Sequence, residues 1–466
     1  MKRVFQLLGM VALVATLSAT VWAWPSVYPT GTTVYDSGNA FDGYTLFAPM
    51  DGMRGATDFY DKPGNAYLID MNGEVVHQWK LPFPPGLHVK LLPNGHLLAT
   101  GRTDRMVPKD RISVKYDLDG IAGWIYELDW DGKIVFKYYD PGMHHDFEKL
   151  ANGNYLFVSF ELLPKDMVRK VRGGMEGTEL KGGNMACDKL VEVSPEGKVV
   201  WEWHAYKHAD LDLDILGPIH PRVEWLHIND IDERADGNLV FSARHTDSVM
   251  VLDRKTGKIK SRFGNVAYLD KKENKVKFRH AGSMLVHSKN TTLGGPHDGH
   301  EIPPGLPGAG HIMVYDNGMY TNTSRALEFD AEKGTVVWES TDFQIGRRHF
   351  SSFISGVQRL PNGDTLICSG ANGRFFEITP DNKIVWEYVN PYKPNHLFNS
   401  TVFRAHRYAP AYCAEFSTLP SAAGAAVVPP DVSTFKVSGV VDDDDDDDED
   451  EDDEDDEEDG PTMHAY

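Results

Sequence analysis

Cysteine is scarce in this 466-residue chain, and the three present, Cys187, Cys368 and Cys413, allow one disulfide at most. They are too few for a fold held together by disulfides, and they lack the paired spacing of a zinc site. Long apolar runs are also missing. The longest, from about residue 7 to residue 21, is shorter than the roughly 20 residues that a membrane-spanning helix needs.

The chain has no excess of basic residues. Its formal net charge is −22, with 47 Lys and Arg against 69 Asp and Glu. Eighteen of the acidic residues form the unbroken run from Asp442 to Asp459, so the rest of the chain carries only −4 of that charge. A nearly neutral body argues against electrostatic binding of nucleic acid.

The two ends differ in composition from the body. The basic start Met1-Lys2-Arg3, the apolar run and the small-residue site at Val21-Trp22-Ala23 are typical of a secretory signal peptide. We therefore predict a signal peptide over residues 1–23, no membrane span, and a periplasmic or secreted protein. A membrane anchor is the alternative, which the short run disfavours.

Residues 413–441 are rich in Ala, Ser, Val and Pro, and we predict a linker there. Residues 442–466 contain the acidic run, whose like charges repel one another and cannot pack, which predicts a disordered tail. Such a tail suits weak binding of divalent cations or of a basic partner. A solubilising appendage is the plainer interpretation.

Between the ends, over residues 24–412, one pattern of short strands recurs. Apolar strands ending near an acidic residue are joined by Asn-Gly or Asp-Gly turns, which indicate β-hairpins. The period of roughly 50–75 residues suits a propeller blade with inserted loops. We predict an all-β, six-bladed β-propeller, closed into a ring by the early strand at residues 43–47. The six copies begin at Tyr67, Tyr126, Leu190, Val249, Ala326 and Phe375.

The repeat also predicts where a site lies. The strand before each Asn-Gly turn is expected to line the central channel, and the copies can be aligned backwards from that turn. This places polar residues at one equivalent position where a repeat could have used Val or Leu. They are His145, Asn229, His297, Ser355 and Asn399, with His227 two residues before the position of the third copy. A binding site is one explanation, and a hydrated structural channel mouth is the other.

Neutral imidazoles and amides have two obvious uses. Metal binding is disfavoured, because these positions give few carboxylates and no closely spaced pair of histidines on one element. Transfer of an anionic group is the other use, with His as nucleophile or acid/base and cationic groups holding the oxygens. Arg325, in Thr323-Ser324-Arg325, could supply a planar fork for such oxygens.

Several segments resemble the arylsulfotransferase family of bacterial propellers. The most specific is Gly294-Gly295-Pro296-His297-Asp298-Gly299-His300 with the turn Gly305-Leu306-Pro307-Gly308-Ala309-Gly310. Trp225-Leu226-His227-Ile228-Asn229 and Ser324-Arg325-Ala326-Leu327-Glu328 are also similar. The resemblance runs from about Pro29 to Tyr408. It implies a six-bladed propeller that moves a sulfuryl group from an aryl sulfate to a phenol without the nucleotide donor PAPS, through a transiently sulfated histidine.

The resemblance also implies roles for residues. His227, His297 and Arg325 match the oxygen-binding and acid/base positions, and His145, Asn229, Ser355 and Asn399 are expected to contact substrate. Where related sequences lead us to expect the nucleophilic histidine, this chain has Phe353 and Asn372. His349 is the nearby candidate.

We therefore expect an arylsulfotransferase acting on aryl sulfates and phenols, with no cofactor and no metal. Two alternatives stay open. One is a propeller without catalytic activity that binds an anionic or aromatic ligand. The other is a hydrolase or lyase that acts on aromatic esters on the same scaffold.

Overall fold

A computed structural model describes residues 30–50, 63–102, 118, 120, 122–279, 292–340, 349–392 and 400–428. The predicted signal peptide and the acidic tail lie outside these residues. Within the described part, none of the helices has the length and apolar character needed to cross a membrane.

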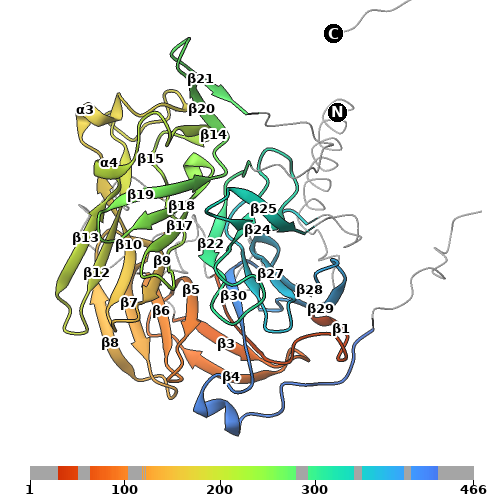
Figure 1. The fold of residues 1–466 in the computed structure, drawn as a ribbon. Helices are drawn as coiled ribbons and strands as arrows, with labels where there is room; N and C mark the ends of the chain where they lie inside the picture. The colour runs from red at the N-terminus through yellow and green to blue at the C-terminus, as the bar shows by residue number, and fades with distance from the viewer. Residues whose placement is uncertain are drawn as a thin grey trace, which may run out of the picture. The chain divides into compact units, whose positions relative to one another are not determined.

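The described body is a six-bladed β-propeller whose blades follow one another in chain order (Figure 1). Each blade is an antiparallel sheet built around four strands. From the innermost strand outwards, the blades are β30 (Val402–Tyr408), β2 (Tyr44–Pro49), β3 (Asn65–Ile69), β4 (Val75–Lys80); β5 (Pro85–Leu91), β6 (Leu97–Arg102), β7 (Gly123–Leu128), β8 (Ile134–Tyr139); β9 (Met143–Lys149), β10 (Tyr155–Leu162), β12 (Ala186–Val193), β13 (Val199–His204); β16 (Asp232–Glu233), β17 (Leu239–Ala243), β18 (Ser248–Asp253), β19 (Lys258–Phe263); β22 (His297–Glu301), β23 (Ile312–Asp316), β24 (Arg325–Asp330), β25 (Thr335–Glu339); and β26 (Gly356–Arg359), β27 (Thr365–Ser369), β28 (Arg374–Ile378), β29 (Ile384–Val389).

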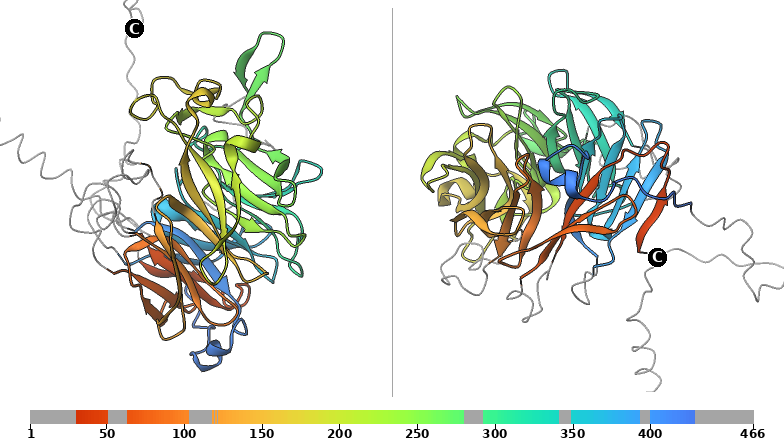
Figure 2. Two further views of the ribbon diagram at one scale, coloured as in Figure 1. Left: turned by 90° about the vertical axis from the view of Figure 1, so that its left-hand side faces the viewer. Right: turned by 90° about the horizontal axis from the view of Figure 1, so that it is seen from below.

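The remaining elements are short additions to these blades. β1 (Gly31–Tyr35) pairs with β29, β15 (Glu224–Trp225) pairs with β12, and β11 (Gly173–Met175) pairs with β14 (Leu216–Pro221). The hairpin of β20 (Ala267–Asp270) and β21 (Lys275–Phe278) projects away from the blades (Figure 2). The described helical turns are α3 (Lys165–Val168), α4 (Ala205–His208), η1 (Arg244–Thr246), η2 (Gly370–Asn372) and η3 (Ala414–Thr418).

The first and last strands of the propeller close its ring. The innermost strands contact one another in the cyclic order β5, β9, β16, β22, β26 and β30, and β30 returns to β5. β2 pairs with β30 through Tyr44 and Tyr408, so the first blade combines both ends of the fold. The predicted closing strand is thus confirmed. Each repeat read from the sequence starts at the third strand of a blade and ends on the second strand of the next.

Tryptophans in the outermost strands join adjacent blades. The indole N–H of Trp79 donates to Asp129 O at 3.3 Å, and that of Trp203 donates to Gly257 O at 3.0 Å. Trp338 and Trp386 make the same bond to the turn of the following blade. A buried Trp needs a partner for its N–H, so the recurring aromatic in the repeat fastens each such blade to its neighbour.

The chain continues past β30 along the first blade. Phe416 in η3 is only 2% exposed and packs edge-on against Tyr44, with the ring centroids 4.8 Å apart. Val427 exchanges backbone hydrogen bonds with Tyr35. The described beginning of the predicted linker is therefore packed on the propeller. Cys187, Cys368 and Cys413 are buried free thiols.

Candidate functional site

The beginnings of the six innermost strands, with the residues that enter β16 and β26, surround one end of the channel. Equivalent positions of different blades form layers across the channel. The pairing of β9 with β10 shifts register between His144 and Phe147, so the adjacent residues His145 and Asp146 can belong to successive layers. The mouth layer consists of Leu87, His145, Asn229, His297, Ser355 and Phe403. The Phe403 ring lies 6.3 Å from that of His145 and 6.4 Å from that of His297. Phe403 thus holds the mouth position of β30, for which the sequence predicted Asn399, a residue outside the described part of the chain.

The next layer is organised by a buried arginine, Arg404. Its Nη1 lies 2.8 Å from Asp146 Oδ2 and 3.3 Å from Asp230 Oδ1. Its Nε lies 3.1 Å from Asp298 Oδ1, so one guanidinium joins carboxylates from three blades. A Cβ at Gly356 would lie 2.9 Å from Arg404 Cγ, which explains glycine at the equivalent position of the last blade.

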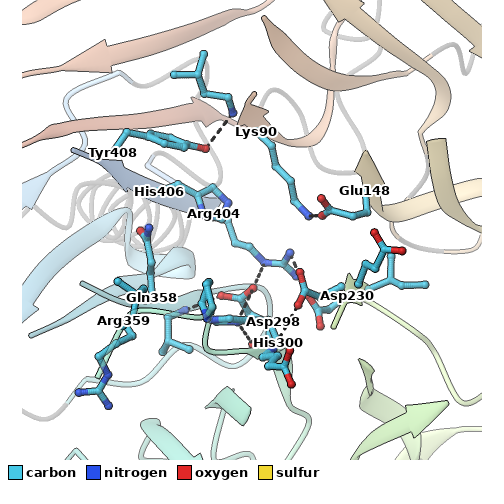
Figure 3. Close-up of a pocket in the computed structure, with 18 of the residues that line it drawn as sticks. Lys90, Glu148, Asp230, Asp298, His300, Gln358, Arg359, Arg404, His406 and Tyr408 are labelled. Atoms are coloured by element: carbon cyan, nitrogen blue, oxygen red, sulfur yellow. Dashed lines mark hydrogen bonds and ion pairs between the residues drawn. The ribbon is translucent and has the colours of Figure 1, made fainter. Parts of the chain in front are cut away.

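Beyond Arg404 the channel opens into a cavity of about 490 Å³ (Figure 3). Lys90 Nζ binds Glu148 Oε2 there at 2.6 Å. Burial, together with the negative charge of Glu148, raises the pKa of Asp232 to about 8. The Arg404 layer therefore lies between this acidic cavity and the histidines of the mouth.

His145 is held at the mouth by a relay of side chains. Its Nδ1 lies 2.8 Å from Nδ1 of His144, and His144 Nε2 lies 3.2 Å from Asp188 Oδ1. The ring also packs on Gly120, where a Cβ would approach within 2.0 Å and where φ is +74°. In the tautomer that has its proton on His144 Nε2, facing the Asp188 carboxyl group, His144 Nδ1 accepts from His145 Nδ1 and a lone pair stays on His145 Nε2.

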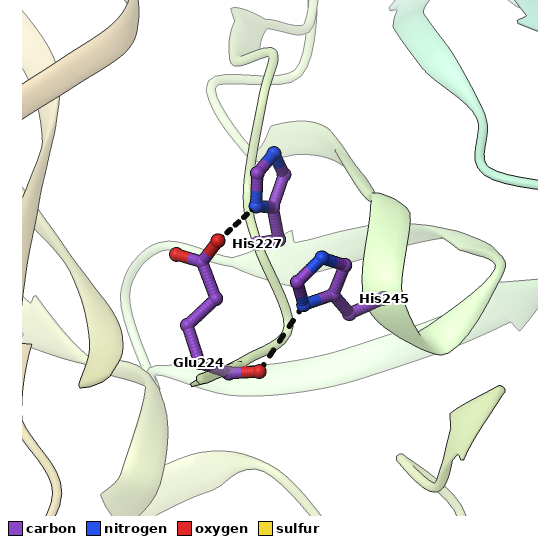
Figure 4. Close-up of side chains that lie close together, drawn as sticks. All are labelled: Glu224, His227 and His245. Atoms are coloured by element: carbon purple, nitrogen blue, oxygen red, sulfur yellow. Dashed lines mark hydrogen bonds and ion pairs between the residues drawn. The ribbon is translucent and has the colours of Figure 1, made fainter. Parts of the chain in front are cut away.

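His227 and His245 form a second group with Glu224 (Figure 4). His227 Nδ1 contacts Glu224 Oε1, and His245 Nδ1 lies 3.2 Å from the Glu224 carbonyl oxygen. The two rings stack with centroids 4.5 Å apart, and the His227 ring lies 4.6 Å from that of His145. The group therefore adjoins the mouth.

His297 lies at the mouth as the first residue of β22. Its Nδ1 lies 2.7 Å from Asn317 Oδ1, and its Nε2 accepts the Ile354 N–H at 3.2 Å. Both nitrogens are thus hydrogen-bonded, with Nδ1 as the donor.

Backbone strain is concentrated at this end of the channel. Non-glycine residues with positive φ cost about 1–3 kcal/mol each and persist where the surroundings hold them. Those in the segments entering the inner strands are His145, Leu226, His227, Asp298, Ile354 and Ser355. These strained residues lie at the mouth or next to it in four blades, which favours a functional site there.

The predicted arginine and the arginine near the histidines are different residues. Arg325 Nε binds Asp316 Oδ2 at 2.9 Å, and its Nη1 binds Glu339 Oε2 at 2.7 Å. Arg244 instead lowers the pKa of His227 and His297 through its positive charge, after the larger effect of burial. Arg244 lies in η1, between the second and third strands of its blade, so the alignment of inner strands could not reveal it.

The other predicted residues that the structure describes make hydrogen bonds or ring contacts within the protein. Asn229 donates to Pro296 O at 2.9 Å and accepts from Ser242 Oγ at 2.6 Å. Ser355 Oγ donates to Ser351 Oγ and accepts from the Gly370 N–H. His349 is buried with its ring centroid 5.3 Å from that of Phe376, and the structure does not bring it to His145, His227 or His297.

Burial keeps the mouth imidazoles neutral near pH 7. It lowers the pKa of His297 to about 3 and holds those of His145 and His227 well below their ordinary value. An apolar wall adjoins them, formed by Met50, Leu87, Ile354, Phe403 and the partly buried Phe353. Neutral imidazoles, one arginine and an apolar wall can bind a ligand with an aromatic part and an anionic part.

Solved structures with a similar arrangement are distant. One is a protein of unknown function from Bacteroides caccae, with 13% identity and a TM-score of 0.45, covering 78% of this chain and 98% of that chain. Another is the periplasmic gluconolactonase PpgL of Pseudomonas aeruginosa, with 11% identity and a TM-score of 0.40, covering 78% of this chain and 99% of that one. A catalytically inactive virginiamycin B lyase from Staphylococcus aureus has 11% identity and a TM-score of 0.38, covering 76% and 91%. These likenesses carry no argument about function.

The sequence comparison is more specific. A search of curated protein sequences found no match. A family model described as arylsulfotransferase (ASST) matches residues 50–405, which include every described strand of the propeller except β1, β2 and the end of β30. The match covers most of the chain and includes the histidines of the mouth, so the protein belongs to the arylsulfotransferase family.

Proposed function

We propose that the protein transfers a sulfuryl group from an aryl sulfate to a phenol, without a nucleotide donor, at the mouth of the channel. The predicted signal peptide supports a periplasmic or secreted location for this reaction. The observation that carries the proposal is the pairing of His145 with His227 beside the Phe403 wall, with Arg244 close enough to lower the pKa of both histidines. The wall would hold the arene, and the polar groups would hold the sulfate.

His145 is our choice for the nucleophile. The relay through His144 to Asp188 would keep the lone pair on His145 Nε2, and burial keeps that imidazole neutral. Nε2 would attack sulfur as the S–O bond breaks, and the phenolate would leave with that electron pair. Arg244 would stabilise the sulfuryl oxygens, because its charge acts within this largely buried site.

In the second half of the reaction, a phenol oxygen attacks the sulfur and the N–S bond breaks. The proton of the phenol must then be accepted nearby. His227 is suited to this role, because Glu224 faces its Nδ1 and leaves Nε2 as the basic nitrogen. His349, predicted from the sequence as nucleophile, has no support from these contacts.

The test is incubation of the purified protein with p-nitrophenyl sulfate, with and without phenol. Release of p-nitrophenolate that depends on phenol, with formation of phenyl sulfate, is the expected result. His297→Ala should abolish it, whereas His311→Ala is a control because His311 pairs with Glu328 outside the mouth at 2.7 Å. Release without an acceptor would indicate a hydrolase instead.

A binding protein without catalytic activity is the second candidate. Two residues at the positions where the family resemblance leads us to expect a nucleophile favour it. Phe353 is part of the apolar wall, and Asn372 Nδ2 donates to Phe350 O at 3.0 Å. Binding of p-nitrophenyl sulfate without any release would support this candidate.

A further inference from the structure

We propose that Glu224, His227 and His245 form a binding site for a divalent first-row transition metal ion such as Zn²⁺. One ligand atom from each of the three side chains lies within 4.8 Å of the other two. Ligand atoms on one zinc ion lie about 3–3.5 Å apart, because Zn–N and Zn–O distances are about 2.0–2.2 Å. Small side-chain rotations would therefore be enough to bring the three atoms onto one ion.

The donor set matches the chemistry of such an ion. Two imidazoles and one carboxylate are a recurring ligand set of catalytic zinc sites, which keep a further position open. Hard ions such as Ca²⁺ and Mg²⁺ prefer sites made of oxygen ligands. The three residues are only 2–5% exposed, so the site is built into the fold.

A hydrogen bond at the far side of one ring supports this assignment. Metal-binding histidines usually donate their second ring N–H to a carbonyl or carboxylate. His245 Nδ1 lies 3.2 Å from the Glu224 carbonyl oxygen, which leaves Nε2 for the metal (Figure 4). Glu224 thus orients the His245 ring through its carbonyl oxygen and supplies its own carboxylate as a ligand.

The carboxylate has an unused oxygen. Glu224 Oε1 contacts His227, whereas Oε2 is buried with no hydrogen-bond partner among the described residues. A buried polar atom without a partner is costly, and a bound cation would satisfy it.

The site goes beyond the proposed sulfuryl transfer, and the two are expected to compete. A metal on His227 Nδ1 would leave the ring proton on Nε2. His227 could then no longer accept the proton of a phenol, so Zn²⁺ is expected to inhibit transfer.

The test uses the full chain and Co²⁺, whose visible absorption reports its coordination. We expect one equivalent of Co²⁺ to give the intense bands of a four- or five-coordinate nitrogen-containing site. Zn²⁺ should abolish them, whereas excess Ca²⁺ should not. The acidic run at residues 442–459 offers only oxygen ligands, so Co²⁺ bound there gives the weak octahedral spectrum.

Variants assign the bands to residues. His245→Gln and Glu224→Gln should each remove them, with circular dichroism melting curves reporting that the variants fold. His311→Gln should keep them, since it breaks a similar His–Glu pair outside the mouth. Absence of the bands in the folded wild type, their persistence in both site variants, or displacement by Ca²⁺ would overturn the proposal. Failure of sulfuryl transfer would leave these spectra unaffected, so the two proposals are tested separately.

Discussion

Arg404 Nη1 lies 2.8 Å from Asp146 Oδ2, although the two residues are 258 positions apart in the chain. Both side chains are buried, and the same guanidinium also reaches Asp230 and Asp298. One residue of the last strand thereby fixes inner strands of three other blades. The layer that it forms supports the mouth histidines on one side and bounds the acidic cavity on the other.

Removing this guanidinium is expected to destabilise the whole propeller. Arg404→Met removes the cation that joins three buried carboxyl groups, and breaking a buried ion pair typically costs about 3–5 kcal/mol. Urea unfolding should show this loss. Lys383→Met breaks an exposed pair with Asp36 and serves as the control, with little expected change. Wild-type stability of Arg404→Met would contradict the central role of this residue.

The two arginines considered for oxygen binding can be separated by activity. Arg244→Met should lower kcat with p-nitrophenyl sulfate by about 10²–10³, the usual effect of removing one stabilising donor. Arg325→Met should keep near-normal turnover if the protein folds, because Arg325 is engaged by Asp316 and Glu339. The reverse order of effects would support the role implied by the family resemblance.

The nucleophile can be identified by mass spectrometry of the intact protein. After brief exposure to p-nitrophenyl sulfate without a phenol, the wild type should gain the mass of one sulfuryl group. His145→Gln should not gain it, whereas His349→Gln should. Peptide mapping of the label to His349 would instead favour the prediction made from the sequence.

The pH dependence of stability should report the burial of His349. Burial lowers its pKa in the folded protein to about 3, against 6.5 ordinarily. Its contribution is therefore fully present above about pH 6.5 and is lost as the pH falls toward 3, by about 1.4 kcal/mol per pH unit. His349→Phe removes this loss. In urea unfolding from pH 7 to pH 4, the free energy of unfolding of the variant should rise relative to that of the wild type. A difference between the two free energies that stays constant with pH would contradict the prediction.

Much of the fold could be predicted because every blade repeats the same local signals. Asn-Gly and Asp-Gly turns mark the hairpins, and aligning on them places His145, Asn229 and His297 at one position, directly before the three aspartates that Arg404 joins. No such turn follows the last inner strand, so the alignment had no reference point there. It assigned the mouth position to Asn399, four residues before Phe403, which holds that position in the structure.

The rest of the candidate site could not be read from the repeat. Glu224 lies on the short strand β15, and Arg244 and His245 lie in η1, so none of the three is in an inner strand. These residues lie close to His227 only in the folded chain. No spacing rule relates them, although a His beside an Arg at the end of a buried strand was a visible signal.

Closure of the ring has a consequence for how the molecule is made. The strand that carries Arg404 is the last of the propeller to be synthesised, so Asp146, Asp230 and Asp298 are translated long before their cation. Until that strand is made, these three carboxyl groups lack the guanidinium that joins them. Docking of the final strand against β2 then brings Arg404 to the aspartates and completes the sheet of the first blade in one step. A chain cut short before residue 402 would lack both, which makes completeness of synthesis a condition for a stable product.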